Sequence, residues 1–266
     1  MKIDEIFSVK NKVAVVTGGS RGIGEMIASA YLANGARVYI TSRKADICDA
    51  KAIELSERYD AQCISLPSDL SSVEGIDSFV RDVESLEESI DILVNNAGAA
   101  WAEPIDKFTE RGWDKVMDLN VKSVFFSTQK FLPLLRKSAS QDDPARVINI
   151  GSIDGIGTPV FETYPYSASK ASVHHMTRVL AARLVKENIL VNAIAPGPFP
   201  SDMLGAAVEH NYEGIISRNP VHRMGRAEDV GGLAIYLSSK AGSYTVGETI
   251  TCDGGTISSS GHDLSE

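Results

Sequence analysis

Short apolar runs recur along the chain, separated by longer stretches in which apolar residues repeat with helical spacing. The first run, 12–17, is rich in β-branched residues and is followed directly by glycine, which is typical of a strand buried in a parallel sheet. Six further runs have the same character: 37–41, 62–66, 91–95, 146–150, 190–194 and 248–252. The pattern therefore predicts seven strands.

Helices are predicted between these runs. In 22–34 the apolar residues Ile23, Ile27 and Tyr31 recur every four positions. Comparable segments lie at about 45–59, 72–88, 111–137, 165–187 and 227–239. Because strand and helix alternate, we predict right-handed crossovers and an α/β fold, 1–266 forming a single domain. The expected architecture is a Rossmann-like, doubly wound, seven-stranded parallel sheet flanked by helices.

Two segments depart from this alternation. The stretch that follows the sixth predicted strand is long and punctuated by Pro and Gly, and we expect its part 197–226 to form a lid over a substrate site. The end of the chain, 257–266, is rich in serine and is expected to be a flexible tail.

Composition narrows the range of functions. The chain carries 26 Lys and Arg against 35 Asp and Glu, and this net charge of −9 argues against a nucleic-acid partner. The three cysteines, Cys48, Cys63 and Cys252, lack the spacing of metal ligands or of a disulfide framework, so we expect no metal site. We find no apolar run of about 18 residues and no secretory signal at the N-terminus. A cytoplasmic protein without a membrane span is therefore expected.

Glycines cluster directly after the first predicted strand. Gly18, Gly22 and Gly24 lie where the absence of side chains allows a tight turn and lets a diphosphate approach a helix N-terminus. Their spacing differs from the G-x-G-x-x-G fingerprint, and a glycine-rich turn also occurs as a plain joint between strand and helix. The position at the start of a βαβ unit favours a dinucleotide site.

The residues after the second predicted strand bear on which dinucleotide binds. An acid there would bind the ribose 2′-hydroxyl of NAD, but this chain has Ser42 followed by Arg43, with Arg21 in the glycine-rich turn. Two guanidinium groups can pair with a 2′-phosphate, and the less favoured alternative is that both are solvated surface charges. We expect NADP(H) as the cofactor.

Tyr166 and Lys170 are four positions apart on a predicted helix, so they project from one face of it, one turn apart. An ammonium in this place stabilises a phenolate and lowers the pKa of a phenol from about 10. We therefore interpret Tyr166 as a proton donor. Tyr164 turns away from Lys170, and Pro165 in the first turn is expected to leave Tyr164 outside the helix, as a cleft wall or a packed aromatic residue.

The chain resembles the short-chain dehydrogenases/reductases from about residue 10 to 256. The motifs that carry this resemblance, in the family's order, are 17–24, 95–98, Ser152, Tyr166 with Lys170, and 196–197. Within the family the sequence looks most like bacterial 3-oxoacyl reductases, and 144–152 resembles those associated with rhamnolipid biosynthesis. The resemblance also implies a homotetramer built through the helices 111–137 and 165–187.

Catalytic roles follow from the same resemblance. Asn120 would hold a water that links Lys170 to solvent, and Ser152 would hydrogen-bond the substrate oxygen. Tyr166 would protonate the alkoxide as hydride arrives from the nicotinamide, while Lys170 would hold the nicotinamide ribose. Negative charge that develops on oxygen needs such donors in place beforehand. Taken alone, Ser152 could be only a strand-end cap and Asn120 a residue that bonds backbone.

The resemblance implies further contacts to the cofactor. After Pro196 and Gly197 the family usually has an aliphatic residue and then threonine, where this chain has Phe199 and Ser201. The implied cofactor residues are Gly18, Ser20, Arg21, Gly22, Ile23, Gly24, Ser42, Arg43, Asp69, Leu70, Asn96, Ala97, Gly98, Tyr166, Lys170, Pro196, Gly197, Phe199 and Ser201.

Apolar side chains suggest the class of substrate. Those expected to line a pocket are Trp101, Phe161, Tyr164, Phe199, Met203 and Leu204, unless several only pack the lid. They favour a 3-oxoacyl chain or another lipophilic ketone. An acyl-carrier partner would need a basic rim near the cleft, but Glu187 follows Lys186 where carrier-dependent relatives usually have a basic residue. CoA esters, free ketones and hydroxysteroids therefore stay open.

Other interpretations are weaker. His174 and His175 face different directions on the helix and are expected to be structural or surface residues. Asp154 near Ser152 suggests a serine hydrolase, but no G-x-S-x-G elbow surrounds that serine. A non-catalytic regulator that senses NADPH is the alternative class, and the intact set Asn120, Ser152, Tyr166 and Lys170 argues against it.

Overall fold

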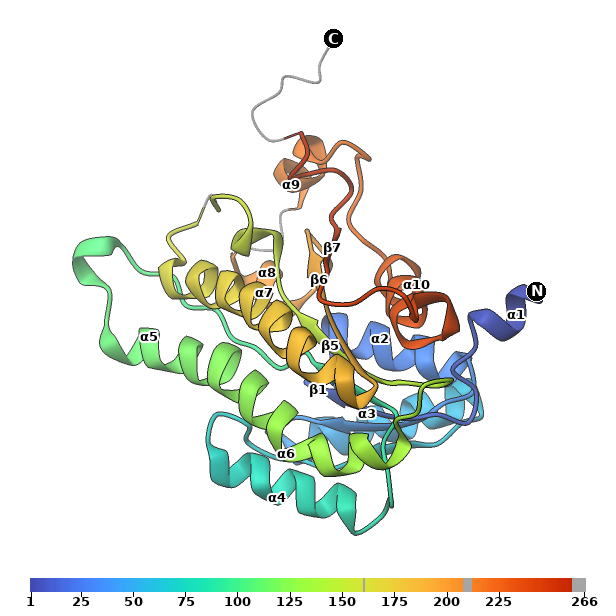
Figure 1. Ribbon diagram of the computed structural model, residues 1–266. Coiled ribbons are helices and arrows are strands. Elements are labelled where there is room, and N and C mark those ends of the chain that lie inside the picture. Colours follow the sequence, from blue (N-terminus) through green and yellow to red (C-terminus); the bar gives the residue numbers. More distant parts are fainter. Residues whose placement is uncertain (160, 208–211, 260–266) are drawn as a thin grey trace.

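The computed structural model describes residues 1–159, 161–207 and 212–259 (Figure 1). Its centre is one sheet of seven parallel strands in the order β3-β2-β1-β4-β5-β6-β7. The strands are β1 (Val13–Thr17), β2 (Arg37–Thr41), β3 (Cys63–Ser65), β4 (Ile92–Asn95), β5 (Ala145–Ile150), β6 (Ile189–Pro196) and β7 (Thr249–Cys252). The predicted fold class is confirmed, with small shifts at the strand ends.

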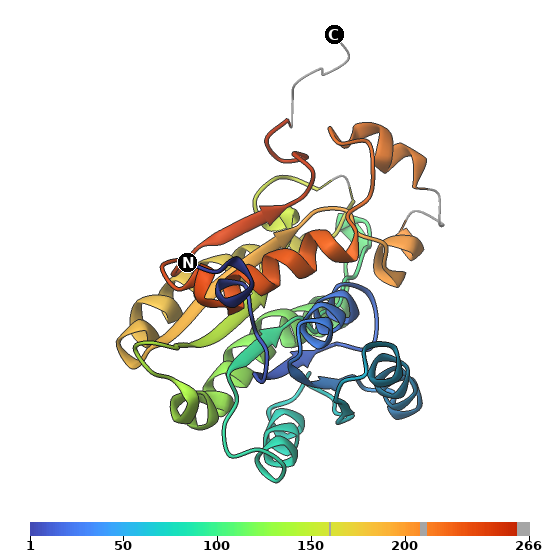
Figure 2. The ribbon, with the colours of Figure 1, turned by 90° about the vertical axis from the view of Figure 1, so that its right-hand side faces the viewer.

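Helices cover both faces of the sheet, as the side view shows (Figure 2). One face carries α2 (Gly22–Ala33), α3 (Ala45–Tyr59) and α10 (Ala227–Ser238), and the other carries α4 (Val73–Glu84), α6 (Ser123–Ser138) and α7 (Tyr164–Leu184). Successive strand residues point to opposite faces, so Val16 joins the apolar cluster under α2 and Val15 joins the one under α4. Both faces of the sheet are therefore lined mainly by apolar strand residues.

The remaining regular elements are short. A helical turn, α1 (Ile3–Ile6), precedes β1, and α5 (Glu110–Met117) precedes α6. The 3₁₀ turns are Ile105–Lys107, Ile153–Gly155, Val185–Glu187 and Lys240–Gly242.

The two longest predicted helices are built differently from the expectation. The helix predicted over 111–137 is interrupted by a π-helical turn, Asp118–Lys122, between α5 and α6. The helix predicted over 165–187 begins one residue earlier, at Tyr164, and ends at Leu184 before a 3₁₀ turn. The expectation that Tyr164 lies outside the helix is wrong, because the first turn accommodates Pro165 in its second position as well as in its first.

The strand order reverses at β1, which places a topological switch point at the carboxyl edge of the sheet. β1 pairs with both β2 and β4, so the connections after β1 and after β4 leave the sheet toward opposite faces. In an open α/β sheet, ligands bind outside the strand ends at such a point. The glycine-rich turn and the segment after β4 therefore lie side by side.

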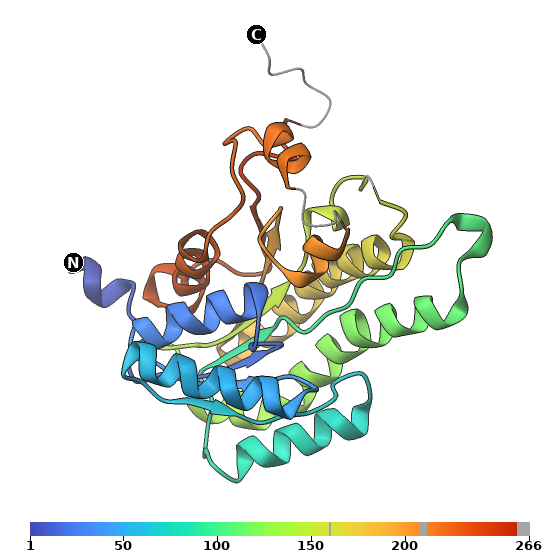
Figure 3. The same ribbon diagram turned by 180° about the vertical axis from the view of Figure 1, so that it is seen from behind.

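The predicted lid and tail are partly described. In 197–226 the chain forms two short helices, α8 (Asp202–Ala207) and α9 (Glu213–Arg218), which project beyond the carboxyl end of β6 (Figures 1 and 3). Residues 208–211 of this segment and 260–266 of the predicted tail lie outside the described residues. At the start of that tail, Ser259 N donates to Gly255 O at 3.0 Å.

Candidate active site

The glycine-rich turn has the backbone that a diphosphate site requires. Gly18 and Gly22 have φ of 65° and 56°, a left-handed conformation that favours glycine. A Cβ on Gly24 would overlap the carbonyl oxygen of Gly18, so α2 approaches the end of β1 closely. Around Gly22 the space is open, since the nearest atom to an added Cβ would be Cβ of Ser201, at 3.5 Å. An open helix N-terminus with a bare backbone fits the diphosphate of a dinucleotide.

Side chains at the ends of β1 and β4 connect the glycine-rich turn to the segment that follows β4. Thr17 Oγ1 accepts hydrogen bonds from the backbone nitrogens of Asn96 and Ala97, at 2.9 and 3.0 Å. Asn96 Nδ2 donates to the carbonyl oxygens of Thr17 and Gly18, at 2.8 and 3.2 Å. An added Cβ on Gly98 would be 3.2 Å from Oδ1 of Asn120, which brings the cofactor segment up to a predicted catalytic residue.

The three residues expected to select NADP differ in their surroundings. Ser42 lies half-buried after β2 and donates to the carbonyl of Lys44 at 3.4 Å. Arg43 is exposed and forms no ion pair with any residue that the structure describes. Arg21 pairs with Asp202 of α8 at 2.6 Å, so this guanidinium joins the glycine-rich turn to the lid. Arg43 is therefore the better placed of the two arginines for an anion.

Several other predicted cofactor residues have structural partners. Asp69 is exposed and its Oδ1 accepts from Ser71 N at 3.0 Å, whereas Leu70 is buried among the residues under α4. Ser20 is buried and Ile23 packs against the apolar cluster under α2. Ser201 Oγ accepts from Leu204 N at 3.2 Å at the start of α8.

The loop after β6 corrects one expectation. Phe199 was predicted to line an apolar substrate pocket, but its side chain is buried in the core beneath the lid, and its ring occupies the space that a Cβ on Gly225 would need. An added Cβ on Gly197 would lie 2.7 Å from Cα of Asp253, so the turn after Pro196 packs closely on the chain after β7. The prediction for Phe199 as a pocket wall is wrong, because its ring anchors the lid.

Asn120 lies at the centre of the π-helical turn Asp118–Lys122 and is buried. Its Nδ2 donates to Ala99 O and to Ser169 Oγ, both at 3.0 Å, and its Oδ1 accepts from Ala99 N at 2.8 Å. The side-chain amide of Asn120 therefore bonds both the segment after β4 and helix α7. Irregular turns of this kind are frequent at functional sites.

Lys170 and Tyr166 meet as the sequence predicts. The ammonium Nζ lies 5.5 Å from the centroid of the Tyr166 ring and donates to the carbonyl of Ile150, the last residue of β5, at 2.8 Å. Lys170 is buried and Tyr166 is partly buried, and desolvation is the largest influence on the titration of both groups. Burial lowers the pKa of Lys170 to about 8, against an opposing effect of the Asp154 carboxylate.

The titration of Tyr166 differs from the expectation. Burial raises the pKa of Tyr166 to about 12, a hydrogen bond with Ser152 lowers it, and the Asp154 carboxylate raises it. The predicted depression of this pKa by Lys170 is wrong for the protein alone, because desolvation of the phenolate and the Asp154 carboxylate together outweigh the hydrogen bond with Ser152. The hydroxyl therefore stays protonated at neutral pH and keeps a proton to give.

Ser152 follows β5 and occupies the cap position before the 3₁₀ turn Ile153–Gly155. Its Oγ accepts from Asp154 N at 3.1 Å, and the same hydroxyl hydrogen-bonds Tyr166. Burial raises the pKa of the Asp154 carboxyl, and Lys170 lowers it. Ser152 is thus a cap, as one interpretation of the sequence has it, and it is also a neighbour of Tyr166. Its contact with a substrate oxygen stays a prediction.

Buried side chains that sequence reasoning missed support this site. Asn95 Nδ2 donates to Asn149 Oδ1 at 2.9 Å and to Thr128 Oγ1 at 3.0 Å, and Asn149 Nδ2 donates to Thr177 Oγ1 at 2.9 Å. This network joins α6, β4, β5 and α7. Polar residues near the ends of two apolar strands were its only signal in the sequence. His174, expected to be structural or superficial, is buried and contacts Ser152.

The outer rim of the site is aromatic and acidic. Tyr164 donates to Glu162 Oε1 at 2.9 Å, and its ring meets Phe108 edge-on at 5.8 Å between centroids. Trp101 packs over Gly112 at the start of α5, with the Lys115 ammonium 4.6 Å from its ring centroid. Large apolar side chains stay exposed on this rim and on the lid: Phe161, Tyr164 and Met203.

One argument about the substrate is wrong. Glu187 was taken as a residue near the cleft, but it lies after the last turn of α7, at the opposite end of that helix from Tyr166, and pairs with Arg136. Over the twenty-one residues of α7 the helical rise amounts to roughly 30 Å. The charge of Glu187 therefore has no bearing on the cleft.

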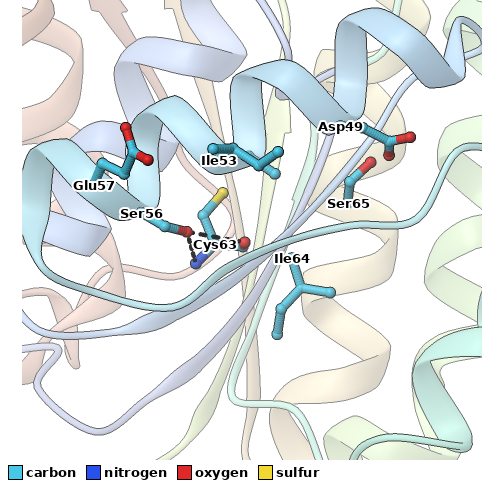
Figure 4. Close-up of a pocket in the computed structure, with 8 residues that line it drawn as sticks. Asp49, Ile53, Ser56, Glu57, Cys63, Ile64 and Ser65 are labelled. Atoms are coloured by element: carbon cyan, nitrogen blue, oxygen red, sulfur yellow. Dashed lines mark hydrogen bonds between the residues drawn. The ribbon is translucent and has the colours of Figure 1, made fainter.

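Hollows elsewhere do not compete with this site. An open hollow of about 420 Å³ lies between α3 and the edge strand β3, lined by residues that include Asp49, Ile53 and Cys63 (Figure 4). Ser56 Oγ bonds the backbone of Cys63 there, which only closes the helix onto the strand. Among the described residues, no group of three or more His, Cys, Asp or Glu side chains could hold a metal, and no helix could span a membrane.

Comparison with known proteins gives the same picture over nearly the whole chain. A family model described as enoyl-(acyl carrier protein) reductase matches residues 18–256. The rhamnolipids biosynthesis 3-oxoacyl-[acyl-carrier-protein] reductase of Pseudomonas aeruginosa is 47% identical over 94% of this chain and 97% of its own length. A 3alpha-hydroxysteroid dehydrogenase of Mediterraneibacter gnavus is 33% identical over 92% and 97%.

Solved structures agree with the sequence relatives. The Pseudomonas aeruginosa RhlG/NADP active-site complex superposes with a TM-score of 0.91, at 46% identity, over 95% of this chain and 99% of that one. Fold, site geometry and sequence similarity lead to one conclusion: the chain belongs to the short-chain dehydrogenase/reductase family.

Proposed function

We propose that this protein reduces the carbonyl of a 3-oxoacyl thioester or a similar lipophilic ketone to a secondary alcohol, with NADPH as the reductant. The observation that carries the proposal is the group formed by Ser152, Tyr166 and Lys170 at the carboxyl edge of the sheet, beside an open glycine-rich turn. When bound, the nicotinamide supplies a hydride to the carbonyl carbon.

The side chains of the site have distinct roles in the reduction. The Ser152 hydroxyl donates a hydrogen bond to the carbonyl oxygen, where negative charge develops. Tyr166, which keeps its proton at neutral pH, transfers it to that oxygen. The Lys170 ammonium stabilises the phenolate that remains. Asn120, fixed by Ala99 and Ser169, holds the route by which Lys170 and Tyr166 regain a proton from solvent.

NADP(H) is supported by the cations near the end of β2. Arg43 is exposed beside Ser42, where an acid would repel a 2′-phosphate, and Arg21 lies in the same region. The Pseudomonas aeruginosa RhlG structure is an NADP complex, and two further structural neighbours have NADP bound. The remaining proposed contacts are Gly18, Ser20, Gly22, Ile23, Gly24, Asp69, Leu70, Asn96, Ala97, Gly98, Pro196, Gly197, Phe199 and Ser201.

The lipophilic substrate is supported by the exposed apolar rim and by the 3-oxoacyl reductase among the relatives. A second candidate is the oxidation of a hydroxysteroid, favoured by the hydroxysteroid dehydrogenase relative. Exposed aromatic side chains such as Phe161 and Tyr164 suit either molecule.

Loss of NADPH absorbance with a panel of 3-oxoacyl thioesters, cyclic ketones and steroids tests the function. We expect turnover of a 3-oxoacyl thioester by the wild type and its loss in Tyr166→Phe, with NADPH binding retained. A regulator that only senses NADPH would bind the dinucleotide and turn over no ketone in either form. Preferred turnover of a steroid would select the second candidate.

We also propose a homotetramer. Trp113 of α5, Phe125 of α6 and Val179 of α7 are large apolar side chains with exposed fractions of 44%, 39% and 50%. They lie on the helices through which the family resemblance implies assembly. Light scattering coupled to size exclusion should give four times the chain mass, and a monomer would contradict this assignment.

A further inference from the structure

His174 lies one helical turn after Lys170 on α7, and only 5% of its surface is exposed. Ser152 N donates to its Nε2 at 3.4 Å, and the backbone of Gly155 bonds the same imidazole. A ring nitrogen that accepts carries no proton, so the proton of the neutral ring belongs on Nδ1. The imidazole therefore spans the turn from Ser152 to Gly155.

Two glycines make this contact possible. A Cβ on Gly151 would overlap Nε2 of His174, and a Cβ on Gly155 would lie 2.6 Å from the backbone nitrogen of Ala171 and 2.9 Å from Cε1 of His174. The segment 151–155 thus rests directly on one turn of α7. The imidazole fills the volume that side chains at those two positions would otherwise occupy.

Lys170 and His174, one turn apart on α7, both bind the backbone at the end of β5. Lys170 Nζ bonds the carbonyl of Ile150, and His174 bonds the amide of Ser152 two residues later. Residues four apart on a helix lie one above the other, so the two contacts form a clamp on the end of β5. With its backbone held in this way, Ser152 has its hydroxyl beside Tyr166.

Burial, assisted by the charges around the ring, keeps His174 neutral. Lys170 and Arg178 approach it from α7, and Asp154 belongs to the 3₁₀ turn packed against it. Burial, followed by the repulsion of Lys170 and Arg178, lowers the pKa of His174 to about 4. At neutral pH the ring can therefore accept from Ser152, which an imidazolium cannot do.

We propose that His174 is a positioning residue for the reaction: its neutral imidazole holds the backbone of Ser152 so that the serine hydroxyl lies beside Tyr166. The role rests on the proposed function, but the hydrogen bond can be observed without turnover. Nothing in the position requires His174 to touch substrate or cofactor.

Three variants test this role. His174→Leu keeps the apolar volume and removes the acceptor, so kcat should fall about tenfold or more, as misplaced catalytic groups do, while the Kd for NADPH stays the same. His174→Gln offers an amide oxygen near the place of Nε2 and should recover most of kcat. His175→Leu, on the exposed neighbour that bonds only Arg178, should behave as wild type.

A spectroscopic readout separates this proposal from the proposed function. Imidazole ¹⁵N shifts of wild type should show Nδ1 protonated and Nε2 free at pH 7, and the Ser152 amide should lose its hydrogen-bonded shift in His174→Leu but not in His174→Gln. A protonated Nε2, an unchanged Ser152 amide, or unchanged kcat in the leucine variant would overturn the role. If the leucine variant fails to fold, His174→Asn, too short to reach Ser152, must show the same losses. Absence of turnover in wild type would refute the proposed function alone.

Discussion

Lys170 donates to the carbonyl of Ile150 at 2.8 Å while its ammonium lies 5.5 Å from the centre of the Tyr166 ring. The cation is therefore held by the backbone of β5, one turn from the phenol, and its position does not depend on a substrate. Burial acts on both groups in the direction that disfavours charge, lowering the pKa of Lys170 to about 8 and raising the pKa of Tyr166 to about 12.

The rate of ketone reduction should decrease at alkaline pH because of Lys170. Tyr166 is protonated well beyond pH 10, so it does not limit proton donation, whereas Lys170 loses its charge as the pH passes about 8. We expect kcat/KM for reduction to be constant from about pH 6 to 7.5 and to decrease above about 8. A profile that stays level to about pH 10 would contradict a role for the ammonium.

Lys170→Met should abolish reduction and stabilise the fold at neutral pH. A shift of the Lys170 pKa from 10.5 to about 8 corresponds to roughly 3 kcal/mol, of which the bond to Ile150 offsets about 1. Between about pH 8 and 10.5 the unfolded chain binds more protons than the folded one, so wild-type stability increases with pH in that window. The free energy of unfolding of Lys170→Met should exceed that of wild type by roughly 2 kcal/mol at pH 7.

The advantage of the methionine variant should diminish as the pH rises above about 8. Urea unfolding at pH 7 and pH 10, for wild type and variant, measures both effects. A variant that is less stable than wild type at pH 7 would mean that the ammonium is not desolvated as its burial implies.

The sequence placed Tyr166 beside Lys170 correctly because their spacing is local. Tyr166 and Lys170 are one turn apart on any helix, and Asn96 follows a strand that must end at the crevice. Burial is not local, and for that reason the direction of the Tyr166 pKa and the place of Phe199 were mispredicted. Both depend on what the lid and the core bring from distant parts of the chain.

The π-helical turn around Asn120 could not be predicted for a related reason. Its extra residue follows no periodicity, and the amide is fixed by Ala99 and Ser169, which are far apart in sequence. The position of Glu187 was misjudged because the sequence does not say which end of α7 faces the cleft. In the parallel sheet, the helix start that carries Tyr166 lies at the carboxyl edge, and Glu187 lies at the other end.

Arg43→Asp should change the choice of cofactor. A guanidinium bound to a phosphate contributes about 1.5–3 kcal/mol, so the Kd for NADPH should rise about tenfold or more while the Kd for NADH stays equal or falls. Arg21→Ala should have a smaller effect, because that side chain already pairs with Asp202. Arg81→Asp, an equal charge change on the exposed side of α4, serves as the control in fluorescence titrations. An unchanged Kd for NADPH in Arg43→Asp would refute the assignment.

Asn149→Leu should destabilise the fold although the volume changes little. The substitution leaves Asn95 Nδ2 without one of its two acceptors in a buried place, at a cost of about 1–3 kcal/mol. Thr177→Val leaves Asn149 Nδ2, which is fully buried, without its acceptor and should cost a similar amount, about 1–3 kcal/mol. Chemical denaturation of both variants measures the two costs, and a negligible cost for either would show that the network does not stabilise the fold.

Gly151→Ala should be destabilising only while His174 is present. The new methyl group would overlap Nε2 of a buried imidazole, and such overpacking costs about 1–3 kcal/mol. His174→Ala removes the obstacle and, by leaving a cavity, costs about 2 kcal/mol alone. In the double variant the methyl group enters that cavity, so the total loss should be smaller than the sum by at least about 1 kcal/mol.

Gly232→Ala, at an exposed helix position with open space, is the matched control and should be neutral or stabilising. Strict additivity of Gly151→Ala and His174→Ala in urea unfolding would mean that the imidazole does not occupy the place beside Gly151 on which the clamp depends.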